Sequence, residues 1–473
     1  MRVLIACALL TVATSPAFAI SDTELRAHVE KRFAGDRTGA CVAVALVGQS
    51  TATTYVCANP KTARPFDARI AFEIGSVTKT MTAALLAEMI ARGEIALGDS
   101  LATLLPPGTS VPSFNGRQIT IADVVTHTSG LPSIPPQWRM TDMNNPYASI
   151  AERDVLGALA HTRLTRAPGS VWEYSNFAMM VLSYAIAKRS GKDFETLLRE
   201  RLFAPLDMND SYIAKLPAGV RPAQGHLSNG IPTGPWDFQV NMAGVGGVRA
   251  TLPDMVRYVE GQLGLRNSAI TPALATTQAQ IADVTRHRMG MNWVLATLNG
   301  RTLAAHEGGT GGFSSLVMFD ATAKRGVVIL SDTALTSLGG SGTLGLSLLD
   351  PAVPPGAPRV ATTADGTLID ALVGRYRLST GLGVELRHKG QALTIQADAQ
   401  PEFELGHDSA GDFYPLQFDA LLRPRRNADG SYTFTWFQGG DAVEAERTGG
   451  PAPLGATPAA RGLRSPCARP AKC

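Results

Sequence analysis

The sequence lacks several features that identify common classes of protein. Only 5 of its 473 residues are cysteine, and no cysteine or histidine spacing is typical of a zinc site, so we expect no metal and no cofactor. The net charge is only +3 without dense runs of lysine or arginine, which argues against a nucleic-acid partner. After residue 19 no apolar run is long enough to span a membrane. The Gly-x-Ser-x-Gly motif of α/β-hydrolases is also missing.

The first nineteen residues predict a secretory signal peptide, residues 1–19. Arg2 precedes a short apolar run, and Ala17-Phe18-Ala19 has the small-residue pattern of a cleavage site. We therefore expect a periplasmic or secreted protein. An alternative is a lipoprotein box ending at Cys7, but only about four apolar residues precede that cysteine, and a signal core needs roughly seven.

An even number of cysteines remains after this cleavage: Cys41, Cys57, Cys467 and Cys473. Residues 41–57 alternate like a β-hairpin with a turn at residues 48–50. Pairing Val47 with Thr51 places Cys41 opposite Cys57, close enough for a cross-strand disulfide. Two buried thiols in the same sheet are the alternative. The other two cysteines lie in a Pro- and Arg-rich tail, and the sequence does not indicate how they pair.

Helices and strands are mixed between residues 20 and 350, which predicts an α+β domain. Apolar residues at helical spacing and terminal glycines predict helices, whereas alternating runs near residues 290–332 predict late strands. Together with the early hairpin, these strands predict a central antiparallel sheet with helices between its first and last strands. The expected helices cover residues 22–33, the segment from Ser76 to Gly93, and residues 121–127 and 177–189.

A second, smaller domain is expected after a Pro- and Ala-rich linker at residues 351–368. Residues 369–450 contain short alternating runs separated by glycine, asparagine and aspartate, which predicts a small all-β sandwich or barrel. Residues 451–473 are expected to form a flexible tail.

The first candidate for chemistry is the pair Ser76 and Lys79. A spacing of three residues on a helix places the amine beside the hydroxyl. A serine needs a neighbouring base to become nucleophilic, and a lysine can be that base if burial lowers its pKa. The start of a helix also offers backbone N–H groups to an oxyanion.

Two further motifs follow along the chain. In the first, Tyr174 is a candidate base, because a nearby lysine favours its ionised form, and the Asn176 amide can bind both an acyl carbonyl and the lysine. The second, His306-Glu307-Gly308-Gly309, lies at a strand end, where glycines permit close approach of a substrate. There His306 is expected to be electropositive, and the backbone N–H of Gly309 is expected to face that of Ser76.

In this order, the motifs resemble the serine β-lactamase and penicillin-binding-protein superfamily, specifically its branch of class C β-lactamases and D,D-peptidases. The resemblance implies that Ser76 is acylated, that Lys79 and Tyr174 transfer protons, and that Asn176, His306 and Gly308 bind substrate. It also implies an oxyanion hole formed by the N–H groups of Ser76 and Gly309. The resembling segments are "FEIGSVTKTMTAALLAEMIARGEIALGDSL", "VVTHTSGLP", "PGSVWEYSNFAMMVLSYAIAKRSG", "FAPLDMNDSY", "AGVGGVRATLPDM" and "HEGGTGGFSS", which cover most of residues 20–335.

The same resemblance implies a sheet flanked by helices, an all-helical subdomain, and a lipocalin-like C-terminal β-domain. Two positions differ from class C β-lactamases: His306 stands where they have the lysine of Lys-Thr-Gly, and Ile134 where they have a glutamine. His127, in the second segment, is expected only to cap a helix and turn.

The sequence thus predicts an exported serine hydrolase acting on D-amino-acid peptides, as D,D-carboxypeptidases and endopeptidases do, or on β-lactams. The substrate would be a small molecule or peptide, such as a peptidoglycan fragment, a β-lactam or an ester. Two alternatives stay open: a β-lactamase-like carboxylesterase acting on short acyl esters, and a non-catalytic penicillin-binding sensor. The sequence does not indicate the oligomeric state.

Overall fold

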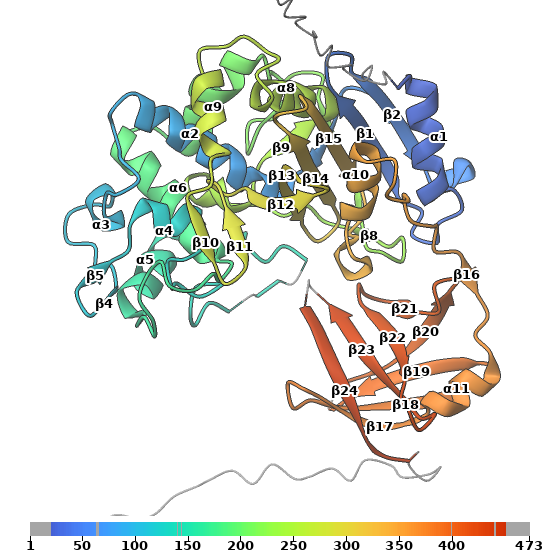
Figure 1. Ribbon diagram of the computed structural model, residues 1–473. Coiled ribbons are helices and arrows are strands. Elements are labelled where there is room, and N and C mark those ends of the chain that lie inside the picture. The colour runs from blue at the N-terminus through green and yellow to red at the C-terminus, as the bar shows by residue number, and fades with distance from the viewer. Residues whose placement is uncertain are drawn as a thin grey trace, which may run out of the picture. The chain divides into compact units, whose positions relative to one another are not determined.

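The computed structural model describes residues 20–62, 66–139, 141–142, 144–398, 400–438 and 441–450 (Figure 1). The expected signal peptide, the tail, and Cys467 and Cys473 lie outside these described residues. The chain divides into two compact units between Ala361 and Thr362, inside the segment predicted to be a linker. Among the described residues, no helix has both the length and the apolar character needed to cross a membrane.

An eight-stranded antiparallel sheet forms the centre of the first unit, in the order β10-β11-β12-β13-β14-β15-β1-β2. Strands from both ends of this unit meet where β1 pairs with β15, as the sequence predicts. The strands are β1 Cys41–Val47, β2 Ala52–Cys57, β10 Ala282–Val284, β11 His287–Met289, β12 Val294–Leu298, β13 Arg301–Gly309, β14 Ser314–Asp320 and β15 Arg325–Ser331.

Both faces of this sheet are buried, so its central strands β1 and β14 are buried along their whole length and mostly apolar. Val42, Val44 and Leu46 of β1 pack against α1 (Asp22–Phe33) and α10 (Gly342–Leu349). The intervening residues of β1 face the larger core, which is shared with the other helices. Figure 1 shows this layered arrangement. The sheet is therefore a rigid support for side chains at the ends of its strands.

The second helical layer is built mainly from two apolar helices, α2 and α6. Helix α6 begins where the Ser175 side chain accepts a hydrogen bond from the Ala178 N–H, and it ends at Gly191, whose φ is 70°. The short hairpin of β4 (Ser113–Phe114) and β5 (Arg117–Gln118) shows that this part is not purely helical. The helices are α2 Thr78–Ala91, α3 Leu101–Leu104, α4 Ile121–Val125, α5 Glu152–His161, α6 Asn176–Ser190, α7 Phe194–Leu198, α8 Leu252–Gln262 and α9 Thr271–Thr277.

Short strands connect these layers near the start of α2. Strand β3 (Ile70–Glu73) pairs with β6 (Arg221–Pro222) and β9 (Arg249–Thr251), and it leads directly into the segment that carries Ser76. A further two-stranded pair consists of β7 (Gly225–His226) and β8 (Pro232–Thr233).

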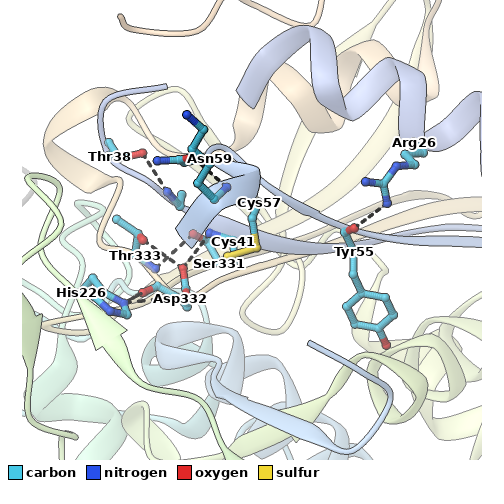
Figure 2. Close-up of a disulfide and its surroundings, with 12 residues drawn as sticks. Arg26, Thr38, Cys41, Tyr55, Cys57, Asn59, His226, Ser331, Asp332 and Thr333 are labelled. Atoms are coloured by element: carbon cyan, nitrogen blue, oxygen red, sulfur yellow. Dashed lines mark hydrogen bonds and ion pairs between the residues drawn. A yellow bond between two sulfur atoms is a disulfide. The ribbon is translucent and has the colours of Figure 1, made fainter. Parts of the chain in front are cut away.

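The predicted disulfide is confirmed. Cys41 and Cys57 face each other in the register of β1 and β2, and their sulfur atoms are bonded. The Cys41 N–H also donates to Oδ1 of Asp332 at 2.8 Å, at the end of β15 (Figure 2). The disulfide and this hydrogen bond together connect three neighbouring strands at one end of the sheet.

The second unit contains a closed eight-stranded antiparallel barrel, because β20 pairs with β21 as well as with β19. Side chains such as Tyr376, Leu386 and Phe434 are buried within its core. Of the two predicted forms, the barrel is confirmed, but helix α11 shows that the domain is not all-β. Its elements are β16 Ala361–Thr362, α11 Gly366–Leu372, β17 Gly374–Leu378, β18 Gly383–Lys389, β19 Ala392–Ala397, β20 Glu402–Asp408, β21 Phe413–Pro415, β22 Leu421–Arg426, β23 Tyr432–Gln438 and β24 Asp441–Gly449.

Candidate active site

Ser76 and Lys79 are in direct contact at the start of α2. Ser76 lies in a 3₁₀ turn, Gly75–Val77, and is partly exposed, whereas Lys79 is fully buried in the first turn of the α-helix. The Lys79 Nζ donates to Ser76 Oγ at 2.8 Å and to the Val245 carbonyl at 2.6 Å. Burial lowers the pKa of Lys79 well below its usual value. This shift favours a neutral amine that can accept the serine proton.

Tyr174 lies beside both groups. The Lys79 Nζ is 4.8 Å from the centre of the Tyr174 ring, and the phenol is hydrogen-bonded to Ser76. Burial raises the pKa of Tyr174 above its usual value, the bond with Ser76 lowers it, and nearby Tyr147 raises it again. The expectation that the lysine makes this phenol easier to ionise is therefore wrong for the free protein. The Tyr174 phenol therefore keeps its proton in the free protein.

The end of β13 packs against the turn that carries Ser76, and glycines make this contact possible. A Cβ atom at Gly308 would lie 2.0 Å from the Ile74 carbonyl oxygen, and one at Gly75 would lie 2.6 Å from the Gly309 nitrogen. The Ser315 hydroxyl donates to the same Ile74 carbonyl at 2.7 Å. The backbone of Gly309 therefore adjoins the nucleophile turn, as an oxyanion hole formed by these two segments requires.

His306 is neutral, contrary to the expectation of an electropositive group. Its side chain is only 7% exposed, and burial is the largest cause that lowers its pKa to about 3. The Nδ1 atom lies 2.7 Å from the Glu307 carbonyl oxygen, which can only accept, so Nδ1 carries the proton. The other ring nitrogen, Nε2, is consequently an acceptor in the free protein.

Asn176 has a partner that the sequence did not reveal. Its Nδ2 donates to the hydroxyl of Tyr147 at 3.3 Å, whereas Lys79 donates to the serine and to a backbone carbonyl as described. The predicted bond between Asn176 and the lysine is not among the hydrogen bonds of the described residues. Asn176 is still the first residue of α6, two positions after Tyr174, and is partly exposed.

His127, expected only to cap a helix and turn, also contacts the segment that carries Tyr174. It is 1% exposed, its Nδ1 accepts from the Ser175 N–H at 3.2 Å, and its carbonyl accepts from the Glu173 N–H at 2.7 Å. Its φ of 57° is unusual for a residue with a side chain. That conformation turns the His127 ring toward the Tyr174 segment. The unusual backbone is not readable from the sequence, although the nearby glycine hinted at a turn.

The acidic residues beside the motifs have structural partners. Glu173 forms an ion pair with Arg166, and the Glu307 carboxylate accepts hydrogen bonds from the backbone of Ser341 and Gly342. Within the described residues, no group of three or more His, Cys, Asp or Glu side chains could hold a metal ion. The chemistry that the arrangement supports is thus acyl transfer to an activated serine.

Comparisons with known proteins agree with this chemistry. A family model described as Beta-lactamase matches residues 25–340. The D-alanyl-D-alanine-carboxypeptidase/endopeptidase AmpH of Escherichia coli (strain K12) is 30% identical over 264 residues, which are 51% of this chain and 65% of that enzyme. The match thus spans slightly less than two thirds of that relative's length. A Beta-lactamase of the same strain is 26% identical over 368 residues, covering 69% of this chain and 93% of that protein.

Solved structures show the same fold. A class C β-lactamase superposes with a TM-score of 0.57 at 21% identity, covering 65% of this chain and 90% of that chain. An octameric penicillin-binding protein homologue from Pyrococcus abyssi gives a TM-score of 0.56 at 16% identity and covers 87% of this chain and 96% of that chain. Because the family match extends over more than half of its length, the chain belongs to the beta-lactamase family, within the superfamily of serine β-lactamases and transpeptidases.

Proposed function

We propose that this protein is an exported serine hydrolase that forms an acyl-enzyme on Ser76. Its substrates are D-amino-acid peptides, cleaved as D,D-carboxypeptidases or endopeptidases cleave them, or β-lactams. The observation that carries this proposal is the 2.8 Å contact between Lys79 Nζ and Ser76 Oγ, in a setting that favours the neutral amine. The signal-like N-terminus and the disulfide support export, because disulfides persist in oxidising compartments.

In the acylation step, neutral Lys79 takes the proton from Ser76 as Oγ bonds to the substrate carbonyl carbon. The developing oxyanion accepts from the backbone N–H groups of Ser76 and Gly309. When the C–N bond breaks, Tyr174 gives its proton to the leaving nitrogen, and the protonated Lys79 restores the phenol. A water molecule then attacks the acyl-enzyme with the same groups acting in reverse, which releases the acid and the free serine.

The neutral His306 supports the choice of substrates with a carboxylate. A carboxylate beside this imidazole favours its protonated form, so the site gains a positive charge only when such a substrate is present. Both a terminal D-alanine and a penicillin carry a carboxylate at a similar distance from the scissile amide. Simple acyl esters lack this carboxylate, so His306 would not contribute to their binding.

The test combines labelling with turnover. We expect a fluorescent penicillin to label the wild-type protein on Ser76, and a D-Ala-D-Ala peptide or a chromogenic cephalosporin to be hydrolysed. The Ser76→Ala variant should be unlabelled and slower by about 10⁴-fold or more, because the catalytic groups act as a unit.

Three outcomes contradict the proposal. A protein that stays acylated without turnover is a sensor. One that hydrolyses only a short nitrophenyl ester is a carboxylesterase. Activity that survives in Ser76→Ala does not use this nucleophile.

A further inference from the structure

Tyr147 lies at the edge of the candidate site with an uncommitted hydroxyl proton. Its side chain is 7% exposed, and its oxygen accepts from Asn176 Nδ2 at 3.3 Å. Within the part of the chain that the structure describes, this is the only hydrogen bond of that hydroxyl. The phenol is also near enough to the reacting groups to influence the pKa of Tyr174. A phenol can donate as well as accept, so Tyr147 has one donor left for a ligand.

Three further aromatic rings surround Tyr147. Its ring centroid is 4.7 Å from that of Phe238, 5.1 Å from Trp138 and 5.5 Å from Trp236. We call Trp138, Tyr147, Trp236 and Phe238 the aromatic wall. The indole nitrogens of both tryptophans are buried and have no hydrogen-bond partner among the described residues. The wall therefore combines apolar ring surface with the O–H donor of Tyr147, while both indole N–H groups are enclosed by the protein.

The aromatic wall is held in place by polar contacts between its two loops. Asn145 and Asp237 form two hydrogen bonds: the Asp237 N–H donates to Asn145 Oδ1 at 2.8 Å, and Asn145 Nδ2 donates to Asp237 Oδ2 at 3.0 Å. Arg249 donates to the Asp237 carboxylate at 3.0 Å and to the Trp236 carbonyl at 2.9 Å. The negative charge of Asp237 is thus already paired with a guanidinium.

The aromatic wall connects two parts of the site. At one end Tyr147 binds Asn176, two residues after Tyr174. At the other end the indole nitrogen of Trp236 would lie 2.5 Å from a Cβ atom at Gly311, just after the strand end that contains Gly309. Both segments that the wall contacts also adjoin Ser76, because Tyr174 is hydrogen-bonded to Ser76 and Gly309 lies against Gly75.

We propose that the aromatic wall is the acyl-group subsite, and that it selects neutral N-acyl substrates with an aromatic or apolar body. The Tyr147 hydroxyl donates to the carbonyl of that N-acyl group, and the rings pack against its apolar part. A free ammonium at the same position would meet the same O–H donor, and the two carboxylates beside the wall, Asp237 and Glu73, are both ion-paired with Arg249. This inference rests on the proposed function, because it requires acylation of Ser76.

Two matched substrate pairs test the selection. Benzylpenicillin carries a phenylacetyl group on the nitrogen that is a free amine in 6-aminopenicillanic acid, and the two compounds are otherwise identical. Phenylacetyl-D-Ala-D-Ala and D-Ala-D-Ala differ in the same way. For the first pair, mass spectrometry measures the second-order rate constant of Ser76 acylation. For the second pair, the rate of D-alanine release is measured. We expect the phenylacetyl member to react at least about 10-fold faster, since one hydrogen bond and ring burial both contribute.

The variant Tyr147→Phe keeps the ring and removes the donor. We expect the phenylacetyl-to-amine rate ratio to fall about 5- to 10-fold, the effect of one lost hydrogen bond. Tyr55→Phe is the matched control, because Tyr55 lies on β2 and its hydroxyl makes no hydrogen bond within the described residues; its ratio should equal that of the wild type. The assignment of the wall as the acyl-group subsite is wrong if the wild type acts on both members of each pair at equal rates. It is also wrong if the rate ratio is unchanged in Tyr147→Phe. Absence of any acyl adduct on Ser76 instead overturns the proposed function, and the subsite with it.

Discussion

The imidazole ring of His127 packs against the phenol ring of Tyr174, with their centroids 4.4 Å apart. The same imidazole accepts the N–H of Ser175, the residue between Tyr174 and Asn176. Burial is the largest cause that lowers the pKa of His127 well below its usual value, so it is neutral. His127 thus fixes the segment that presents the phenol without adding a charge beside Lys79.

Replacing His127 with phenylalanine tests this positioning role. The variant His127→Phe keeps a ring against Tyr174 but leaves the buried Ser175 N–H without an acceptor, which costs about 1–3 kcal/mol. We expect kcat to fall roughly 10- to 100-fold with little change in KM, because the phenol is displaced relative to the scissile bond. Steady-state kinetics on the D-Ala-D-Ala peptide measure this. His161→Phe, on the exposed surface of α5, is the control, and an unchanged kcat in His127→Phe would exclude the role.

The buried Lys79 should make stability depend on pH. Its pKa is lowered in the folded protein but ordinary, near 10.5, in the unfolded chain, so the unfolded chain binds more protons between the two values. The free energy of unfolding should therefore decrease as pH falls from 10.5 toward the folded pKa, by up to about 1.4 kcal/mol per pH unit. Chemical denaturation at several pH values should show this dependence in the wild type and its loss in Lys79→Met. Equal pH dependence in both proteins would show that Lys79 does not titrate abnormally.

Gly308→Ala should damage the contact between β13 and the Ser76 turn. Its Cβ would overlap the Ile74 carbonyl, so the strand end has to move away and take the Gly309 N–H with it. We expect at least a 100-fold loss of acylation rate, comparable to loss of one oxyanion donor. Gly157→Ala in α5, where a Cβ meets no atom within 4 Å, is the control and should leave both rate and fold intact. A Gly308→Ala protein with a normal acylation rate would contradict the oxyanion assignment.

Removing the disulfide should reduce stability without altering the chemistry. Cys41 and Cys57 are 16 residues apart, and closing a loop of that size contributes about 3 kcal/mol in the chain-entropy description. The double variant Cys41→Ser/Cys57→Ser should unfold at a lower temperature in calorimetry, with kcat/KM unchanged at 25 °C. The wild type in reducing buffer should show the same loss, whereas unchanged melting temperatures would mean that the hairpin is stable without the bond.

Much of the fold was predictable from the sequence wherever the pattern that specifies an element lies within the element itself. The register of β1 and β2 follows from alternation and a three-residue turn, so the pairing of the two cysteines followed as well. Helix α6 was predicted within a residue because its apolar residues have helical spacing and a glycine ends it. Strand β24, by contrast, has a polar sequence and is a strand because it pairs with β17 and β23 on either side. Such pairing is not visible in the segment itself.

In the candidate site, too, local features were predictable and long-range ones were not. The contact of Ser76 with Lys79 follows from helical spacing, and it was predicted. The protonation of Tyr174 and His306 depends on burial by distant segments, so the sequence left Tyr174 open as base or acid and predicted a positive charge for His306 that the structure does not support. Tyr147 reaches Asn176 across 29 residues of sequence, so no local pattern indicated its role.

The bond from the Ser315 hydroxyl to the Ile74 carbonyl joins positions 241 residues apart in the chain. The nucleophile and its second oxyanion donor are therefore brought together only when the late strands have joined the early ones. A chain in which these strands have not yet paired holds Ser76 away from the Gly309 N–H, so its serine lacks the second donor that the proposed reaction needs. Under the proposed function, acylation of Ser76 is for this reason also a readout of complete folding, and a penicillin label would then report correctly assembled molecules.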